Sequence, residues 1–219
     1  VTGAPPSPFD RQKKQDNLIA GNYRLLERIG EGGMSDVYRA VHQHLGREVA
    51  IKILHPHLVT NKSSLDRFKQ EAKAVSQLHH KSVVTIHDFG LTEDNRPYLV
   101  MDLLVGKSLS ELIKAKGRIE QEQALPIFLQ IAEALAYTHN AGIIHRDLKP
   151  SNVLILPPDQ VRIVDFGIAK LQTQEGGDTA ALTQTGEVFG SPLYMSPEQC
   201  KGERLDSRSD IYSMGCLMY

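Results

Sequence analysis

The chain has 219 residues, of which 41% are hydrophobic, and this is enough for one large domain or two small ones with a real core. Its 25 basic and 26 acidic residues leave a net charge of −1, so no overall field draws it to nucleic acid or to a membrane surface. The two cysteines, Cys200 and Cys216, argue against a disulfide scaffold, and no apolar run approaches the roughly 20 residues of a membrane span.

The first residues are rich in proline and polar side chains and show no periodicity, which predicts a flexible linker over residues 1–20. The chain begins with Val1 rather than Met, and it stops at Tyr219 in an apolar run without a helix-ending signal. We therefore expect both ends to be cut from a longer protein.

Short β-rich runs alternate with turns between Tyr23 and Leu54, a pattern that predicts an antiparallel meander. The stretch 63–78 has apolar residues at spacings of three and four, which predicts an amphipathic helix. Two further strand-like runs follow at 83–90 and 97–104. Together these elements predict a small β-rich lobe with one helix over residues 21–103.

Helical patterns dominate residues 104–219. Ser108 and Glu111 have the spacing of a capping box at the start of a helix. The run 127–142 predicts a buried helix that ends at a glycine, and Pro126 is expected to delay or kink its start. A mainly helical second lobe is the result.

Polar groups suited to phosphate chemistry flank a predicted hairpin over residues 153–164. The stretch HRDLKPSN, residues 145–152, supplies a carboxylate, a cation and an amide oxygen, and DFG, residues 165–167, adds another carboxylate. Such oxygens suit hard cations such as Mg²⁺, which binds through one or two carboxylates and substrate phosphates. Phosphoryl transfer needs charge neutralisation and alignment of the attacking oxygen, and this set of groups can supply both.

The stretch IGEGGMSDVY, residues 29–38, has three glycines in four positions and then β-formers. Alone, it fits either a phosphate-binding loop or an ordinary hairpin turn. It lacks the Lys-Ser/Thr ending of a Walker loop and leads into a strand rather than a helix. A hairpin folded over phosphates unites the two interpretations, with Gly30 and Gly32 in a G-x-G-x-x-G pattern whose third place is taken by Ser35.

In order and spacing, these motifs resemble those of eukaryotic-like protein kinases. The resemblance runs from Tyr23 to the last residue and includes VAIK at 49–52, a helix glutamate, and SPE at 196–198 in place of A-P-E. The stretch GSPLYMSPEQ is most similar to the corresponding stretch of bacterial Ser/Thr kinases. The resemblance implies a two-lobed α+β fold, with an antiparallel β-sheet and one helix in the N-lobe and a mainly α-helical, incomplete C-lobe. It also implies ATP and Mg²⁺ as cofactors.

The resemblance assigns the catalytic roles. Asp147 would accept or orient the proton of the substrate hydroxyl, and Lys149 would face the transferring phosphoryl group. Asn152 would act with them, and together with Asp165 it would hold Mg²⁺. The nucleotide-binding residues that the resemblance implies are Ile29, Gly30, Glu31, Gly32, Gly33, Val37, Ala50, Lys52, Glu71, Met101, Asp102, Leu104, Leu154 and Asp165.

Within this nucleotide set, the resemblance implies that Lys52 contacts the α and β phosphates of ATP and that Glu71 fixes it by an ion pair. Met101 would form the back wall of the adenine pocket. The backbone of Asp102 and Leu104 would hydrogen-bond the adenine edge. An isolated lysine in a strand or glutamate on a helix is usually only a solvated residue, so the ordered set of motifs carries these assignments.

The segment between the two last motifs, residues 165–198, is long for a loop and contains four threonines: Thr173, Thr179, Thr183 and Thr185. Arg146 is a cation that a phosphothreonine could engage, which would order the segment. The resemblance favours phosphorylation at Thr183 and Thr185, while the alternative is a merely soluble loop. By the same resemblance, Ser191 and Lys149 imply Ser/Thr as the acceptor.

Three functions compete at this point. The first is an active Ser/Thr kinase that acts on protein substrates and self-associates for autophosphorylation. The second is a docking module with the kinase fold and weak or no activity. The third is a small-molecule phosphotransferase. We expect a cytoplasmic domain, or the cytoplasmic part of a membrane-anchored protein, with no nucleic-acid partner and no membrane contact within this segment. Asp210 is expected to brace the catalytic loop near His145, in a last helix whose apolar face is exposed.

Overall fold

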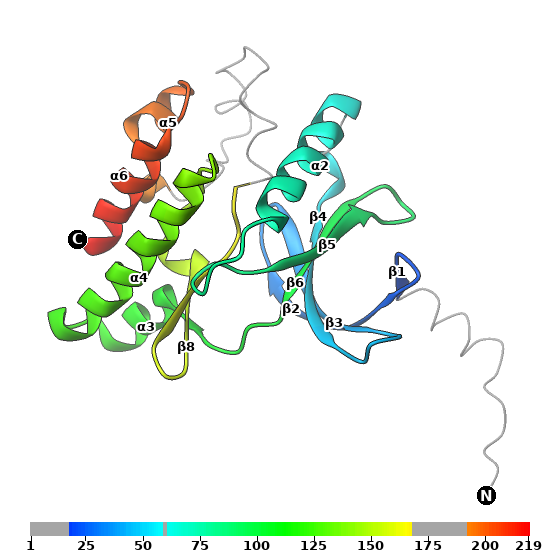
Figure 1. Ribbon diagram of the computed structural model, residues 1–219, viewed down its shortest axis with the longest axis horizontal. Helices are drawn as coiled ribbons and strands as arrows, with labels where there is room; N and C mark the ends of the chain where they lie inside the picture. The colour runs from blue at the N-terminus through cyan, green and yellow to red at the C-terminus, as the bar shows by residue number, and fades with distance from the viewer. Residues whose placement is uncertain (1–17, 59–60, 168–191) are drawn as a thin grey trace, which may run out of the picture. The chain divides into compact units, whose positions relative to one another are not determined.

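The computed structural model of the chain describes residues 18–58, 61–167 and 192–219 (Figure 1). The contacts divide the chain into two units, one of residues 1–65 and 86–103 and the other of residues 66–85 and 104–219. Residues 66–85 therefore group with the second unit, whereas the sequence pattern places them in a lobe of residues 21–103. That lobe boundary stays a prediction.

The first unit is built on an antiparallel sheet with the strand order β1-β2-β3-β4-β6-β5 among the described residues. The strands are β1 (Leu18–Ile19), β2 (Tyr23–Glu31), β3 (Ser35–His42), β4 (Glu48–Leu54), β5 (Ile86–Leu91) and β6 (Pro97–Asp102). Because β2 pairs with β3 and β3 with β4, the meander expected from the sequence is confirmed.

The two faces of this sheet differ in character, as the two-residue period of a strand requires. In β4, Val49, Ile51 and Ile53 lie on one face and are almost fully buried. With residues of the neighbouring strands they form the apolar core of the unit: Ile19, Tyr23, Ala40, Val49, Ile51, Ile53, Tyr98 and Val100. Ala50 and Lys52 therefore lie on the opposite face.

Helix α2 (Lys62–Ser76) follows the short 3-10 turn η1 (Pro56–Leu58). It begins where the side-chain oxygen of Asn61 accepts a hydrogen bond of 2.8 Å from the backbone N–H of Ser64, which satisfies a donor of the first turn. The apolar spacing expected from the sequence is realised, since Phe68, Ala72 and Val75 are buried.

In the second unit, helix α3 (Leu109–Lys116) has the predicted capping box at its start. The hydroxyl of Ser108 accepts a hydrogen bond from the backbone N–H of Glu111 (3.1 Å), and Glu111 Oε2 accepts one from the backbone N–H of Ser108 (2.7 Å). Two donors at the helix start are thus satisfied by one pair of residues.

Helix α4 (Gln121–Asn140) is longer than the sequence predicts, because it begins five residues before Pro126. The expectation that this proline delays the helix is therefore wrong. A proline removes the hydrogen bond to the carbonyl four residues earlier, here that of Glu122, and both residues are exposed, where water can replace the lost donor. Further along, Ile127 and Ile131 are buried in the core.

The second unit also contains a small sheet with the strand order β7-β8-β9, which includes the predicted hairpin. Strand β7 is Lys107–Ser108, β8 is Val153–Leu156 and β9 is Gln160–Ile163, and the turn η2 (Pro150–Asn152) leads into β8. In register, Val153 lies opposite Ile163, and both are buried. The hairpin thus fixes the two chain segments that flank it.

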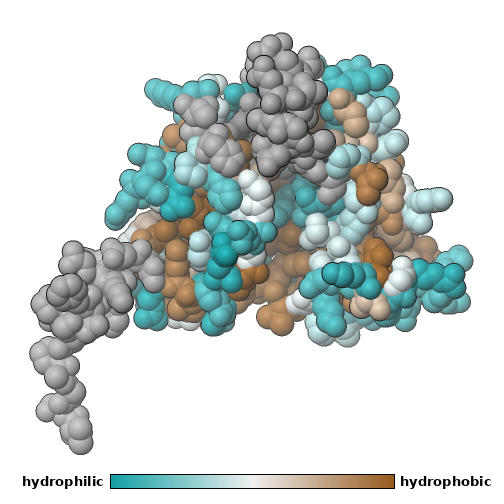
Figure 2. Space-filling model, turned by 180° about the vertical axis from the view of Figure 1, so that it is seen from behind, coloured by the Kyte–Doolittle hydropathy of each residue, from teal (hydrophilic) through white to brown (hydrophobic). Residues whose placement is uncertain are grey.

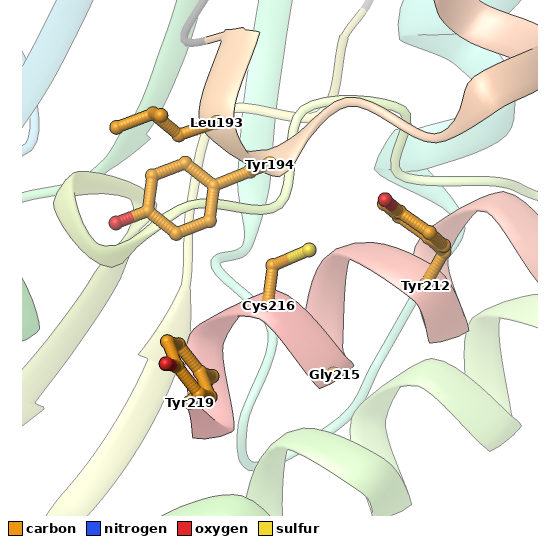
Figure 3. A pocket seen from close by; sticks show the side chains of 6 residues that line it. All are labelled: Leu193, Tyr194, Tyr212, Gly215, Cys216 and Tyr219. Atoms are coloured by element: carbon orange, nitrogen blue, oxygen red, sulfur yellow. The ribbon is translucent and has the colours of Figure 1, made fainter.

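The last described elements are η5 (Pro192–Tyr194), α5 (Pro197–Lys201) and α6 (Ser207–Met218), and α6 lies beside α4 (Figure 1). An apolar pocket of about 640 Å³ opens between η5 and α6 (Figure 3). Its lining residues are Leu193, Tyr194, Tyr212, Gly215, Cys216 and Tyr219. Ile211 and Met218 of α6 are more than half exposed, which confirms the expected exposed apolar face of this helix.

Hydrophobic and hydrophilic residues alternate over the molecular face drawn in Figure 2. Among the described residues, single apolar side chains such as Leu45 and Val105 are exposed. Isolated exposed apolar residues are ordinary on protein surfaces and need no functional explanation.

Candidate active site

The loop His145–Asn152 connects α4 to β8, and its first two peptides are anchored to α6. Oδ2 of Asp210 accepts a hydrogen bond from the backbone N–H of His145 (2.8 Å), and Oδ1 accepts one from that of Arg146 (2.9 Å). The expectation that Asp210 braces this loop is therefore confirmed. A further contact joins Asp210 Oδ2 to Nε2 of His139 in the last turn of α4 (2.8 Å).

The Asp210 carboxylate is almost completely buried, at 1% exposure. Burial by itself raises the pKa of a carboxyl group, but the hydrogen bonds from His139 and from the two backbone N–H groups outweigh it. The pKa of Asp210 therefore lies below its ordinary range, and the anchor is ionised at neutral pH.

His145 links the loop His145–Asn152 to the DFG segment. Its side chain is fully buried, Nε2 lies 2.9 Å from the carbonyl oxygen of Val164, and its ring packs against that of Phe166 at a centroid distance of 4.7 Å. The backbone N–H of Gly167 donates to the carbonyl oxygen of His145 (2.8 Å). A Cβ at Gly167 would lie 3.1 Å from that same oxygen, so the close approach favours glycine.

Asp147, Lys149 and Asn152 come together within this loop. Nζ of Lys149 lies 3.0 Å from Oδ2 of Asp147, and Nδ2 of Asn152 donates both to that oxygen (3.1 Å) and to the Asp147 carbonyl oxygen (2.8 Å). Asn152 is buried, whereas the side chain of Asp147 is 16% exposed to solvent and that of Lys149 is 22% exposed. The carboxylate is thus oriented by a cation and an amide and stays accessible.

Oxygen ligands for a hard cation are present in the same unit. The amide nitrogen of Asn152 is committed as a donor, so its other atom, the amide oxygen, has the chemistry of a Mg²⁺ ligand. The backbone N–H of Val164, next to Asp165, donates to the carbonyl oxygen of Asn152 (2.9 Å). Among the described residues, no group of three or more His, Cys, Asp or Glu side chains is placed to hold a metal ion.

Two non-glycine residues of the site have left-handed backbone. Arg146 has φ +65° and Asp165 has φ +60°, a region that costs residues with a Cβ roughly 1–2 kcal/mol. Such conformations persist where the surroundings hold them. At Arg146 the holding groups are the Asp210 carboxylate on its N–H and the side chain of Gln199, whose Nε2 donates to its carbonyl oxygen (2.8 Å).

Arg146 also forms an ion pair with Glu71 of α2, in which Nη1 donates to Oε1 at 3.0 Å. Burial raises the pKa of Glu71 above its ordinary range, and the Arg146 guanidinium offsets part of that increase. The pairing of Glu71 with Lys52, implied by the resemblance, stays a prediction.

In the first unit, four of the predicted nucleotide-binding residues share one face of the sheet: Val37, Ala50, Lys52 and Met101. Residues directly opposite in an antiparallel pair lie on the same face, and Val37 is opposite Lys52 while Ala50 is opposite Met101. Because Ala50 and Lys52 are two positions apart, all four residues are on the same face, away from the apolar core.

The glycine cluster forms the predicted hairpin between β2 and β3, with Glu31 opposite Asp36. None of Gly30, Gly32 and Gly33 has a positive φ, and a Cβ at any of them would meet nothing closer than 3.5 Å. Neither backbone conformation nor packing within the described residues explains these glycines. Space left open at a glycine hairpin suits the close approach of a ligand.

The family described as "Protein kinase domain" matches residues 23–219 of the chain. The chain belongs to the protein kinase family. The serine/threonine-protein kinase pkn3 of Myxococcus xanthus is 41% identical over 214 residues, which are 96% of this kinase and 39% of that protein. Serine/threonine-protein kinase PknA of Mycobacterium tuberculosis is 40% identical over 205 residues, which are 92% of this kinase and 46% of PknA.

The crystal structure of the Mycobacterium tuberculosis PknI kinase domain matches with a TM-score of 0.72 at 26% identity, and the match covers 90% of this kinase and 72% of that chain. This match confirms the expected α+β kinase fold. The kinase spans less than half the length of the two curated relatives above.

Some sequence-based expectations fall on residues outside the described ranges. These are residues 1–17 of the predicted linker, most of the segment 165–198 with its threonines, and Ser191. The last residues of the linker predicted over 1–20 are described, and there Leu18–Ile19 form β1 instead of flexible chain, because Ile19 packs in the apolar core. In the described parts of the kinase, no helix is both long and apolar enough to cross a membrane.

Sequence reasoning missed two residues that the site uses. His139 contacts Asp210 across 71 positions, and Gln199 contacts Arg146 across 53. Neither residue belongs to a motif that points to its partner. The only local signal is at Gln199, which closes a capping box with Ser196 at the start of α5.

Proposed function

We propose that this kinase transfers the γ-phosphoryl group of ATP to Ser or Thr hydroxyls of proteins. The observation that supports it most is the arrangement of Asp147, with Lys149 and Asn152 on its carboxylate oxygen. A carboxylate held in this way can orient a hydroxyl and accept its proton. The names of the relatives, serine/threonine-protein kinases, favour the same acceptors.

The residues would divide the work as follows. Asp147 positions the acceptor hydroxyl and takes its proton, while Lys149 places a positive charge beside the oxygens where negative charge builds up. Asn152 and Asp165 would hold Mg²⁺, and this ion, when bound, neutralises phosphate charge.

In the first unit, the glycine hairpin and Lys52 would contact the phosphates of ATP. The backbone of Asp102 and Leu104 would hydrogen-bond the adenine edge. Leu154 of the second unit would contact the base as well. The open space at Gly33 supports the phosphate part of this proposal.

We further propose that the kinase phosphorylates itself in the segment 165–198, by contact between two copies. Arg146 is the cation that a phosphothreonine there would engage. Phosphopeptide mapping after incubation with Mg·ATP tests this, and an unmodified segment in an active kinase would contradict it.

The central test is Asp147→Asn, a nearly isosteric change that removes the base. We expect phosphorylation of a generic basic protein to fall by about 10²–10⁴-fold, because general-base catalysis contributes that much. ATP binding should be nearly unchanged, because Asp147 is assigned to the acceptor. Asp159→Asn, the same substitution at an exposed turn residue of the β8–β9 hairpin, is the matched control.

Three outcomes separate the candidate functions. Loss of turnover in Asp147→Asn alone supports the proposal. Equal turnover in both variants contradicts the assignment of the base, and an inactive parent that still binds protein would indicate a docking module. Phosphorylation of small alcohols or aminoglycosides in place of proteins would indicate a small-molecule phosphotransferase.

A further inference from the structure

Three segments of the first unit meet at the carboxylate of Asp102, the last residue of β6. Its Oδ1 atom accepts a hydrogen bond from Nη2 of Arg47 (2.9 Å) and lies 2.8 Å from Nε2 of His87. Arg47 lies in the turn just before β4 and His87 belongs to β5, and β4 and β5 are the two neighbours of β6 in the sheet.

His87 reaches Asp102 because β5 contains a bulge. Ile86 lies opposite Met101 and Asp88 lies opposite Val100, which leaves His87 as the extra residue between two successive pairs. A bulge of this kind redirects a side chain and increases the local twist. Here it turns the imidazole towards the end of β6.

Arg47 is placed by the turn between β3 and β4. Its carbonyl oxygen accepts a hydrogen bond from the backbone N–H of His42 (2.9 Å), and the left-handed Gly46, φ +65°, closes the turn through its own N–H to the His42 carbonyl oxygen (2.8 Å). The arginine is therefore presented by a closed turn and not by a free strand end.

The Asp102 side chain lies on the reverse of the predicted nucleotide face. Asp102 is opposite Val49, whose side chain is in the apolar core, whereas Ala50 and Met101 are on the other face. The carboxylate is thus not placed to contact a nucleotide on the Ala50 face. It can act on adenine only through the backbone of its own residue.

We propose that Arg47 and His87 are positioning residues that hold the backbone of Asp102 in the geometry that reads the adenine edge. This inference rests on the function proposed above. A backbone carbonyl at Asp102 and a backbone N–H at Leu104 match the amino donor and ring-nitrogen acceptor of adenine, whereas guanine presents the opposite pattern. A fixed backbone therefore contributes both affinity and discrimination.

The test uses Arg47→Met and His87→Ala in the full chain, with binding of Mg·ATP and Mg·GTP measured by calorimetry. For each variant we expect ATP to bind roughly three- to tenfold more weakly, with GTP affected less, because loss of preorganisation reduces affinity without removing a contact. KM for ATP should rise while kcat at saturation stays within about twofold. His87→Gln, which keeps a donor, should restore most of the ATP affinity.

Arg96→Met is the matched control. Arg96 forms an ion pair with Asp94 (2.7 Å) in the turn that precedes β6, at the end of the strand opposite to Asp102. The Arg96→Met variant loses the same kind of Arg–Asp contact, and its affinity for both nucleotides should match that of the parent.

The outcomes keep this inference separate from the proposed function. Unchanged ATP affinity and ATP/GTP preference in Arg47→Met and His87→Ala, in an active parent, would overturn the positioning role alone. An equal loss of ATP affinity in Arg96→Met would mean that the variants act through the general stability of the strand. That result would also overturn the positioning role. A parent that binds neither nucleotide would contradict the proposed function itself.

Discussion

The Asp210 carboxylate in α6 accepts a hydrogen bond of 2.8 Å from the backbone N–H of His145, 65 residues earlier in the chain. A single buried group thereby sets the start of the predicted catalytic loop, and Asp147 follows two residues later. The position of the predicted base thus depends on a residue that belongs to no catalytic motif.

Asp210→Asn should lower the free energy of unfolding by about 3 kcal/mol at pH 7, because a buried charged acceptor with several donors is lost. The pKa of Asp210 is depressed in the folded state, so its contribution is present above the unfolded pKa of about 4 and is lost as the pH falls through the folded value. Urea unfolding of parent and variant between pH 7 and pH 3 measures this. A difference that grows towards acid pH would contradict it.

Lys149→Met should lower kcat by roughly 10–100-fold, because a cation 3.0 Å from the Asp147 carboxylate is removed from the site of charge development. The free energy of unfolding should change by less than about 1 kcal/mol, since the pair is partly exposed. Lys201→Met, which removes a lysine 3.9 Å from Glu203 on the surface, is the control for steady-state kinetics. Equal kcat values in the two variants would refute the role of Lys149.

Ile131→Ala should destabilise the kinase by about 3–4 kcal/mol, since this side chain is fully buried on the inner face of α4. Leu129→Ala, two residues away on the same helix, removes a side chain that is 56% exposed and should change stability by about 0.5 kcal/mol or less. Denaturant unfolding compares them, and similar losses would mean that the orientation of α4 is wrong.

Gly106→Ala and Gly142→Ala separate two reasons why a position requires glycine: a lack of space for a Cβ atom and a left-handed backbone. A Cβ at Gly106 would lie 2.5 Å from the backbone carbonyl oxygen of Ile155, and we expect a loss of about 3 kcal/mol, because the strand cannot give way cheaply. At Gly142, φ is +75° but the space is open, so only the backbone term of about 1 kcal/mol should appear. Thermal unfolding ranks the two, and a reversed order would contradict the geometry.

Local patterns in the sequence were sufficient for much of the fold. The capping box of Ser108 and Glu111, the β8–β9 hairpin and the antiparallel meander each depend on residues close together in the chain. The start of α4 was not predictable, because the cost of Pro126 depends on its exposure, which a sequence does not show.

The site could be predicted where chemistry lies inside a motif, as for Asp147, Lys149 and Asn152, which the structure places in contact. It could not be predicted where tertiary contacts decide. The bulge that turns His87 towards Asp102 is a matter of strand register, and the contact of His139 with Asp210 joins two helices. The partner of Lys52 stays a prediction.

Arg146 is fixed at three points, by Asp210 on its N–H, by Gln199 on its carbonyl oxygen and by Glu71 on its guanidinium. Glycine would adopt the same left-handed backbone without steric penalty, so stability of the loop alone favours glycine at this position. The fold instead retains a long cationic side chain against the preference of its own backbone. What position 146 provides is therefore the positive charge that pairs with Glu71 of α2, and the loop is built to tolerate the conformation that delivers it.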